Sequence, residues 1–260
     1  MPSFPVYTLA ERPDLEAQVL DLSFEVWDAF MLEDAVANRL WMRLFTDFPE
    51  YQTTMCDAEG QVIASGNTIP LVWDGTVEGL PKGWDGVLEN GFRDHDSGLQ
   101  PDTLSALSIS IAKSRQGQGL SKELLKGMKW IAASHGLGNL IAPVRPSVKS
   151  KYPLIPMERY CEWTNSNGAL FDPWLRTHSR LGAEVLGVEP ESMYISGTVA
   201  QWEQWAGMRF PESGSYVVPG ALVPIIVDTE QDRAIYVEPN VWMRHRVTEQ
   251  DLLFRAPHAG

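Results

Sequence analysis

Cysteine and positive charge are both scarce in this sequence. Its two cysteines, Cys56 and Cys161, stand far apart among 260 residues, without the density of a disulfide framework or the paired spacing of a zinc site. Twenty-one Lys and Arg residues face 34 Asp and Glu, which leaves a formal net charge of −13. Such a surface disfavours unspecific binding to nucleic acid or to anionic membranes. We therefore expect a cytoplasmic protein that binds neither nucleic acid nor membranes.

Long apolar runs, repeats and linkers are missing as well. No stretch of about 18 apolar residues occurs, and the first residues lack the basic and apolar regions of a signal peptide. We expect no membrane span and no export. Hydrophobic residues nevertheless make up 44% of the chain, which suffices for one sizeable core. We predict a single domain over residues 1–260, with a core at about 15–200 and a C-terminal extension at about 200–260.

The first hundred residues predict helices followed by a hairpin. Apolar side chains recur at helical spacing over residues 13–30 and 32–45. Residues 51–56 and 61–72 are strand-like and flank a short acidic turn, which is typical of a hairpin. Residues 74–102 contain six glycines and a net charge of −5, so we expect a long acidic surface loop inserted into the domain.

A strand, a glycine turn and a helix follow in direct succession. Residues 103–112 alternate with a period of two, and the helix that starts at Leu120 places Leu124, Leu125 and Met128 on one face. Asp172 and Pro173 indicate the start of a later helix. The remaining expected elements are strands at 139–144 and 192–197, a helical turn at 201–208, and paired strands at 222–227 and 234–237.

Positive charge is concentrated around the glycine turn. Residues 113–159 carry nine basic and two acidic side chains, so this window is +7 while the rest of the chain is −20. The turn lies at a helix N-terminus, where unpaired backbone N–H groups and the helix dipole favour an anion. The sequence therefore predicts a phosphate or pyrophosphate site. The spacing differs from a P-loop, and Lys122 stands where a dinucleotide fingerprint has its third glycine.

The segment Ile111-Ala-Lys-Ser-Arg-Gln-Gly-Gln-Gly-Leu-Ser121 resembles the central motif of the GNAT superfamily of N-acetyltransferases, Arg/Gln-x-x-Gly-x-Gly/Ala. Gln116 and Gly119 match this motif, and Ser121 departs from its usual last glycine or alanine. The segment His178-Ser-Arg-Leu-Gly-Ala-Glu-Val185 is similar to a second signature of the family, Tyr-x-Lys-Leu-Gly-Phe. The order of elements also matches, over about residues 15–200. The resemblance implies an α+β fold with a mixed, mostly antiparallel sheet flanked by helices.

The resemblance further implies acetyl-CoA or another acyl-CoA as co-substrate, bound between the strands at 103–112 and 139–144. The acyl group would pass to the amine of a small molecule by direct attack. The pyrophosphate would bind to the backbone of the glycine turn, and the pantetheine arm would pair with the main chain of the strand at 103–112. A backbone N–H near Ile109 to Ile111 would stabilise the oxyanion. The implied cofactor-binding residues are Ile109, Ile111, Gln116, Gly117, Gln118, Gly119, Leu120, Ser121 and Lys122.

His178 occupies the position of the tyrosine acid that many family members carry, and an imidazole exchanges protons near neutral pH. The alternative is a partly exposed helix histidine. Glu158, in the proline-interrupted segment before the last core helix, is the candidate base, and its alternative is a solvated partner of Arg159 or Lys151. We expect Asp172 to act as a helix N-cap. Aromatic residues of the second half, Trp174 among them, are candidates for walls of the acceptor pocket.

The five histidines show no metal-binding spacing, so we predict no metal. The missing strand carboxylate and tyrosine favour an alternative, a CoA-binding module without turnover. A nucleotide-binding transferase at the same anion site is a second alternative. The acyl acceptor stays unidentified at this stage, and the oligomeric state, for which a homodimer is one option, stays open.

Overall fold

The computed structural model describes residues 4–255; the terminal residues 1–3 and 256–260, which we assigned to the same domain, lie outside the described part. A nine-stranded sheet organises this part of the chain, with its strands in the order β1-β2-β3-β4-β5-β9-β8-β7 and β6 paired to β9. Only β4 and β5 run parallel. The expected α+β fold with a mixed, mostly antiparallel sheet is confirmed. The strands are β1 Val6–Thr8, β2 Thr53–Cys56, β3 Val62–Leu71, β4 Thr103–Ile111, β5 Asn139–Val144, β6 Glu184–Gly197, β7 Gly214–Tyr216, β8 Ile225–Asp228 and β9 Arg233–Arg246.

The helices differ in length from the expectation. The first predicted helix ends early because Trp27 is extended, and short helical pieces follow it where one helix was expected over 32–45. Within residues 4–255, no helix has both the length and the apolar character needed to cross a membrane. The α-helices are α1 Glu16–Val26, α2 Ala35–Leu40, α3 Arg43–Asp47, α4 Gly83–Asp96, α5 Leu120–Ser134, α6 Met157–Cys161, α7 Pro173–Arg180 and α8 Val199–Ala206, and the 3-10 helices η2 Ala29–Glu33 and η6 Glu249–Arg255 are used below.

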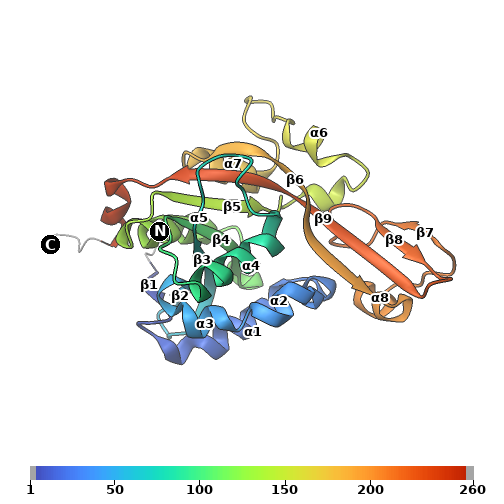
Figure 1. Cartoon of the computed structure of the whole chain (residues 1–260), viewed down its shortest axis with the longest axis horizontal. Helices are drawn as coiled ribbons and strands as arrows, with labels where there is room; N and C mark the ends of the chain where they lie inside the picture. Colours follow the sequence, from blue (N-terminus) through green and yellow to red (C-terminus); the bar gives the residue numbers. More distant parts are fainter. Residues whose placement is uncertain (1–3, 256–260) are drawn as a thin grey trace.

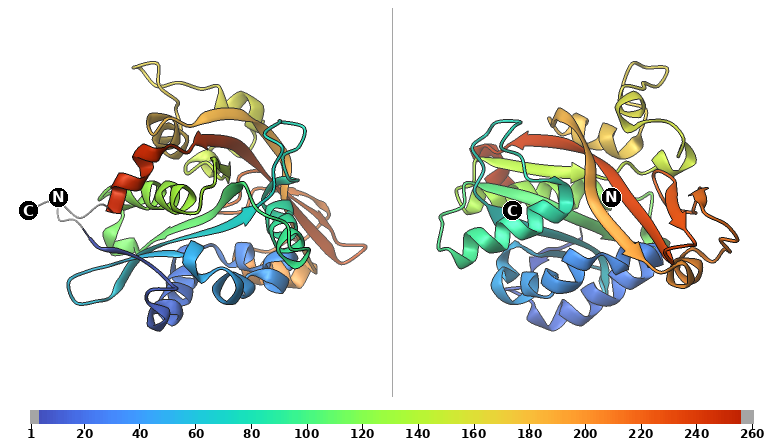
Figure 2. Two further views of the ribbon diagram at one scale, coloured as in Figure 1. Left: turned by 60° about the vertical axis from the view of Figure 1, so that its left-hand side comes forward. Right: turned by 45° about the vertical axis from the view of Figure 1, so that its right-hand side comes forward.

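Helices α4 and α5 cover opposite faces of the sheet (Figure 2). A Cβ on Gly66 of β3 would lie 2.7 Å from the side chain of Met128 of α5. Three residues further along the same strand, Ile69 contacts α4, because a Cβ on Gly91 would lie 2.5 Å from its Cδ1. Side chains of a strand alternate between faces, so these two contacts place one helix on each side.

The expected loop at 74–102 is wrong for its central part, which forms α4. Trp84, Val87, Leu88 and Phe92 are buried along one side of this helix, at the spacing of an amphipathic helix. The high glycine content masked this pattern. Gly91 is needed because the helix approaches β3 too closely for a side chain. This glycine therefore permits close packing of a helix and does not mark a loop.

The strands near the C-terminus belong to the central sheet (Figure 1). The expected pairing around residues 222–237 is confirmed as β8 with β9. Strand β9 continues much further than predicted and pairs with β5 through Val241 to Arg246. Its other edge pairs with β6, which is also longer than the strand expected at 192–197. Residues close to the C-terminus are therefore held beside the parallel pair β4–β5.

Candidate active site

The glycine turn has the geometry of an anion site. Gly117 and Gly119 have φ values of +76° and +81°, a left-handed conformation that is accessible to glycine at little cost. Gly119 is the N-cap of α5, and no side chain of the described residues caps this helix. The first N–H groups of α5 therefore remain available to a ligand. Gln116 stabilises the turn by donating its side-chain amide to the Ile111 carbonyl over 3.4 Å.

Several basic residues near this turn are already paired. Lys126 binds Glu123 at 2.9 Å, and Lys129 binds Asp251 of η6 at 2.8 Å. Arg115 reaches Asp57 more loosely, at 3.3 Å. The exposed residues Lys113 and Lys122 form no ion pair within residues 4–255. Positive charge directed to a phosphate would thus come from these two lysines and from Arg115.

Strands β4 and β5 separate beside the turn. Their pairing covers only Thr103 to Ser105 on β4 and Asn139 to Ile141 on β5. Pro143, just beyond, has no backbone N–H to continue a ladder. Residues of both strands past this point line a cavity of about 830 Å³, within the range of small-molecule sites. The lining residues from the turn and the two strands are Arg115, Gln116, Gly117, Gly119, Leu120, Ser121, Ala106, Leu107, Ser108, Ile109, Ile111, Ala142, Pro143 and Val144.

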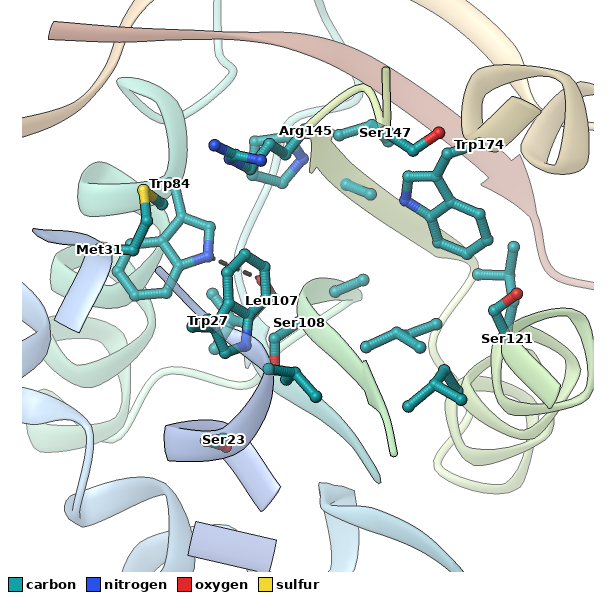
Figure 3. Close-up of a pocket in the computed structure, with 18 of the residues that line it drawn as sticks. Ser23, Trp27, Met31, Trp84, Leu107, Ser108, Ser121, Arg145, Ser147 and Trp174 are labelled. Carbon is teal, nitrogen blue, oxygen red and sulfur yellow. Dashed lines mark hydrogen bonds between the residues drawn. The ribbon is translucent and has the colours of Figure 1, made fainter. Parts of the chain in front are cut away.

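The cavity therefore joins most of the residues implied for the co-substrate. Ile109, Ile111 and five residues of the turn line it, whereas Gln118 and Lys122 stand beside it in solvent. In the close-up, Ser121 lies at one end and Trp84 at the other, with Trp174 above Ser121 and Arg145 above Trp27 (Figure 3). The cavity thus extends from the glycine turn to a tryptophan-lined end, which we propose below as the place of the acceptor and call the acceptor end.

A buried ion pair lines the acceptor end. Arg145 follows β5, and its Nε donates to Glu238 Oε2 of β9 over 2.9 Å. The same carboxylate accepts from the Tyr236 hydroxyl at 2.7 Å and from the Asn240 amide at 3.1 Å. Arg145 Nη2 also donates to the Gly220 carbonyl at 2.6 Å. These hydrogen bonds satisfy a carboxyl group that is 0% exposed and fix its position beside the cavity.

Tryptophans form the apolar wall of this end. The Trp84 indole N–H donates to the Leu107 carbonyl at 2.8 Å, and the Trp27 indole N–H donates to Ser110 Oγ at 3.1 Å. Trp41 stacks on Trp84 with ring centroids 5.8 Å apart and an interplanar angle of 20°. The hydrogen bonds fix the ring orientations, so the wall is preorganised before a ligand binds.

His178, on α7, lines the cavity. It is not the partly exposed helix histidine that the alternative interpretation expects. It is 2% exposed, and its Nδ1 lies 3.0 Å from Nε2 of His245 on β9. Burial, followed by the neighbouring His245, lowers the pKa of His178 well below the ordinary 6.5. Burial also lowers the pKa of His245, to about 4. Both rings are therefore neutral at neutral pH, and one N–H is shared between them.

Glu158 is not brought to the site. It is exposed on α6 and does not line the cavity. Asp172 caps α7 as expected, through the N–H groups of Trp174 and Leu175. Glu238, Asn240, Trp27 and Trp84 also line the cavity, and none of them is predicted from the sequence. The signal for Glu238 was a carboxylate within the otherwise apolar pattern around Val237 and Val241.

No group of three or more potential metal-binding side chains lies together in the described part of the chain.

Comparison with known proteins adds independent information. No protein-family model matches the sequence. The chain is 31% identical over 278 aligned residues to the arginine N-acetyltransferase avaD of Aspergillus versicolor, with 95% of each chain covered.

Solved structures share the fold. The loading GNATL domain of CurA from Lyngbya majuscula matches with a TM-score of 0.61 and 16% identity, covering 95% of this chain and 98% of that one. The GphF GNAT-like decarboxylase in complex with isobutyryl-CoA matches with a TM-score of 0.57 and 15% identity, covering 94% and 100%. At such identities the likeness concerns the fold alone.

The glycine turn, the separated strands and the cavity that joins them define a transferase that uses a CoA thioester. The chain belongs to the GNAT superfamily of N-acetyltransferases. Its activity is the acetyl-CoA-dependent acetylation of an amine, which decides between the transferase and the CoA-binding module without turnover.

Proposed function

We propose that the acceptor is arginine or a small molecule that contains an arginine side chain. The observation that carries this proposal is the buried pair of Arg145 and Glu238 at the acceptor end of the cavity. Glu238 is the carboxylate among the described lining residues; it already binds the Arg145 guanidinium, and the guanidinium of an acceptor would share or compete for the same charge. The name of the relative avaD, an arginine N-acetyltransferase, agrees with this chemistry.

The residues of the chain then have separate tasks. The N–H groups at the start of α5 hold the pyrophosphate, and the main chain of β4 beyond Ser105, free of β5, receives the pantetheine arm. A neutral amine attacks the thioester carbonyl; the N–C bond forms, the C–S bond breaks, and the thiolate leaves. The amine loses one proton and the thiolate gains one. Backbone N–H groups of β4 near Ile109 to Ile111 would stabilise the oxyanion.

We propose that His178 acts here through a hydrogen bond and not as an acid or base. A ring whose pKa lies well below 6.5 holds no extra proton at neutral pH and accepts one poorly. Its Nε2 is buried and has no hydrogen-bond partner among the described residues. Replacement by Gln keeps a polar group at this place, whereas Ala removes it.

The two histidine variants separate these roles. Loss of one hydrogen bond lowers kcat by about tenfold, whereas loss of general acid–base catalysis lowers it by roughly 10² to 10⁴. We expect about tenfold for His178→Ala and near-normal turnover for His178→Gln. A loss above a hundredfold in both variants, together with a pH profile that loses a limb, would restore His178 as the acid or base.

A panel of amines tests the acceptor. The purified protein is incubated with acetyl-CoA and arginine, agmatine, citrulline, ornithine, lysine or an arginine-containing dipeptide, and free thiol release is followed. We expect turnover with the guanidinium compounds and little with citrulline, which has the shape of arginine without its charge. Mass spectrometry of the product identifies the acetylated nitrogen. Equal rates with citrulline and arginine would refute recognition through Glu238.

Binding of the co-substrate has its own measurement. CoA at one hundred times its dissociation constant adds about 2.7 kcal/mol to the free energy of unfolding, which a thermal-shift experiment detects. ATP is the control, because it supplies phosphates without the pantetheine arm. Stabilisation by ATP but not by CoA would contradict the assignment of the cavity to a CoA thioester.

A further inference from the structure

Two aspartates of different helices meet beside the acceptor wall. Asp34 is the N-cap of α2, and its Oδ1 accepts the Ala37 N–H at 2.7 Å. Asp85 lies in the first turn of α4, and its Oδ2 accepts the Tyr194 N–H of β6 at 3.0 Å. Each carboxyl group thus has one oxygen with an assigned partner.

The other two oxygens require a proton. Asp34 Oδ2 and Asp85 Oδ1 are buried and have no hydrogen-bond partner among the described residues, although the Val36 N–H also interacts with the Asp34 carboxyl group. The two carboxyl groups interact with each other through their side chains. Two carboxylates repel each other, whereas a carboxylic acid and a carboxylate form a strong hydrogen bond. The geometry is therefore satisfied when the pair holds one proton.

The local charges favour retention of this proton. Burial first, and then the charge of Asp34, raise the pKa of Asp85 to about 8. Glu89 adds negative charge near both groups, although it is itself paired with Arg39 at 2.6 Å. The Tyr194 hydroxyl is engaged by Arg233. Other charged or titratable residues lie at or close in sequence to Asp34, Asp85 and their partner Tyr194. They are Glu33 on η2, Arg39 on α2, Lys82 and Glu89 at α4, and Glu191 and Tyr194 on β6.

The same two helices carry the acceptor wall. Helix α2 contributes Asn38 and its C-cap residue Trp41 to the cavity, and α4 contributes Trp84, the residue next to Asp85. The two indoles stack at 5.8 Å. The carboxyl pair is therefore a buried polar contact between the two helices that hold this stack, in addition to the exposed ion pair of Arg39 and Glu89.

We propose that Asp34 and Asp85 share a proton that holds α2 against α4 and thereby positions the Trp41–Trp84 wall for amine binding. They are positioning residues, since neither lines the cavity. This inference rests on the proposed acceptor end of the cavity. When the pH rises far enough to remove the proton, two adjacent carboxylates remain, the helices separate and the acceptor binds more weakly. Binding of acetyl-CoA, at the other end, is unaffected.

The test compares Asp85→Asn with the unmodified enzyme between about pH 6 and 9.5. An amide donates a hydrogen bond to Asp34 at every pH. Because ionisation of the amine affects both enzymes alike, its effect cancels in the ratio of their kcat/KM values for the amine. We expect a ratio near one at low pH and a rise of about fivefold in favour of the variant above pH 8, as for loss of one hydrogen bond. The matched control is Asp96→Asn, an exposed aspartate of the same helix.

A ratio that stays flat with pH, or a KM for acetyl-CoA that changes in parallel, would overturn the inference. If Asp85→Asn does not fold, Asp34→Asn tests the same contact, because Asn also caps helices. Tryptophan fluorescence against pH, without any substrate, is a separate readout of the wall. A fluorescence transition near pH 8 that Asp85→Asn abolishes supports the inference even if no amine of the panel is acetylated, and its absence contradicts it.

Discussion

Trp84 donates its indole N–H to the main-chain carbonyl of Leu107 over 2.8 Å. Leu107 is the bulged residue of β4, because β3 pairs with Ala106 and Ser108 on either side of it. A bulge leaves its extra residue without a ladder partner and redirects the strand. Here the acceptor wall supplies the missing partner. The wall and strand β4 are thus held as one unit.

We expect Trp84→Phe to impair acceptor use selectively. Phenylalanine keeps an aromatic surface but leaves the Leu107 carbonyl without its donor, which costs about 1–3 kcal/mol of stability for a buried group. The kcat/KM for the amine falls by about tenfold, while the KM for acetyl-CoA stays constant. Steady-state kinetics with each substrate varied in turn measure this. Trp205→Phe, a change on α8 outside the cavity, is the control.

Gly119→Ala is expected to weaken CoA binding. Alanine at φ +81° costs about 1–2 kcal/mol, and relief of that strain rotates the first N–H groups of α5 away from the ligand. Gly136→Ala is the matched control, because Gly136 has a φ of +71° and follows the end of the same helix. Both variants lose similar stability, and only the first loses affinity in calorimetric titration. Equal CoA affinities would argue against the anion site.

Glu238→Gln is expected to destabilise the fold and to raise the KM for a guanidinium acceptor. The substitution leaves Arg145 without its charged partner at a largely buried place, and breaking such a pair costs about 3–5 kcal/mol. Urea unfolding gives the stability, and a double-mutant cycle with Arg145→Met isolates the coupling between the two side chains. Additive effects of the two substitutions would show that the pair is not coupled.

The pair of His178 and His245 predicts a loss of stability in acid. Their pKa values in the folded protein are lowered, to about 4 for His245, so the unfolded chain binds protons first as the pH falls below 6.5. Each histidine then removes about 1.4 kcal/mol per pH unit until its folded pKa is reached. His245→Gln reduces this slope between about pH 6.5 and 4, whereas the exposed His95→Gln does not. Identical slopes in all three proteins would contradict the burial of neutral rings.

Local patterns predicted the centre of the fold. The hairpin of β2 and β3, the strand β4, the glycine turn, α5 and β5 follow from alternation, helical spacing and the two glycines at 117 and 119. These signals arise within a few residues of each other, so the sequence contains them directly. The cofactor end of the cavity depends on the same segment, so its residues can be predicted from the sequence.

The acceptor end depends on distant contacts. The local pattern around Gly91 predicts a loop, because the packing of this glycine against Ile69 of β3 involves a distant part of the chain. Glu238 was missed because its place opposite Arg145 follows from the pairing of β9 with β5, across almost one hundred residues. The position of Glu158 in the chain makes it a candidate base, but the structure shows it in solvent.

Strand β9 comes last among the strands in sequence, yet it lies inside the sheet between β5 and β6. It brings Glu238 and Asn240 to the cavity and His245 to His178. During synthesis, the ribosome still covers this strand when the glycine turn and β5 have already emerged. The nascent chain thus has the segment for the nucleotide end well before it can form the amine end.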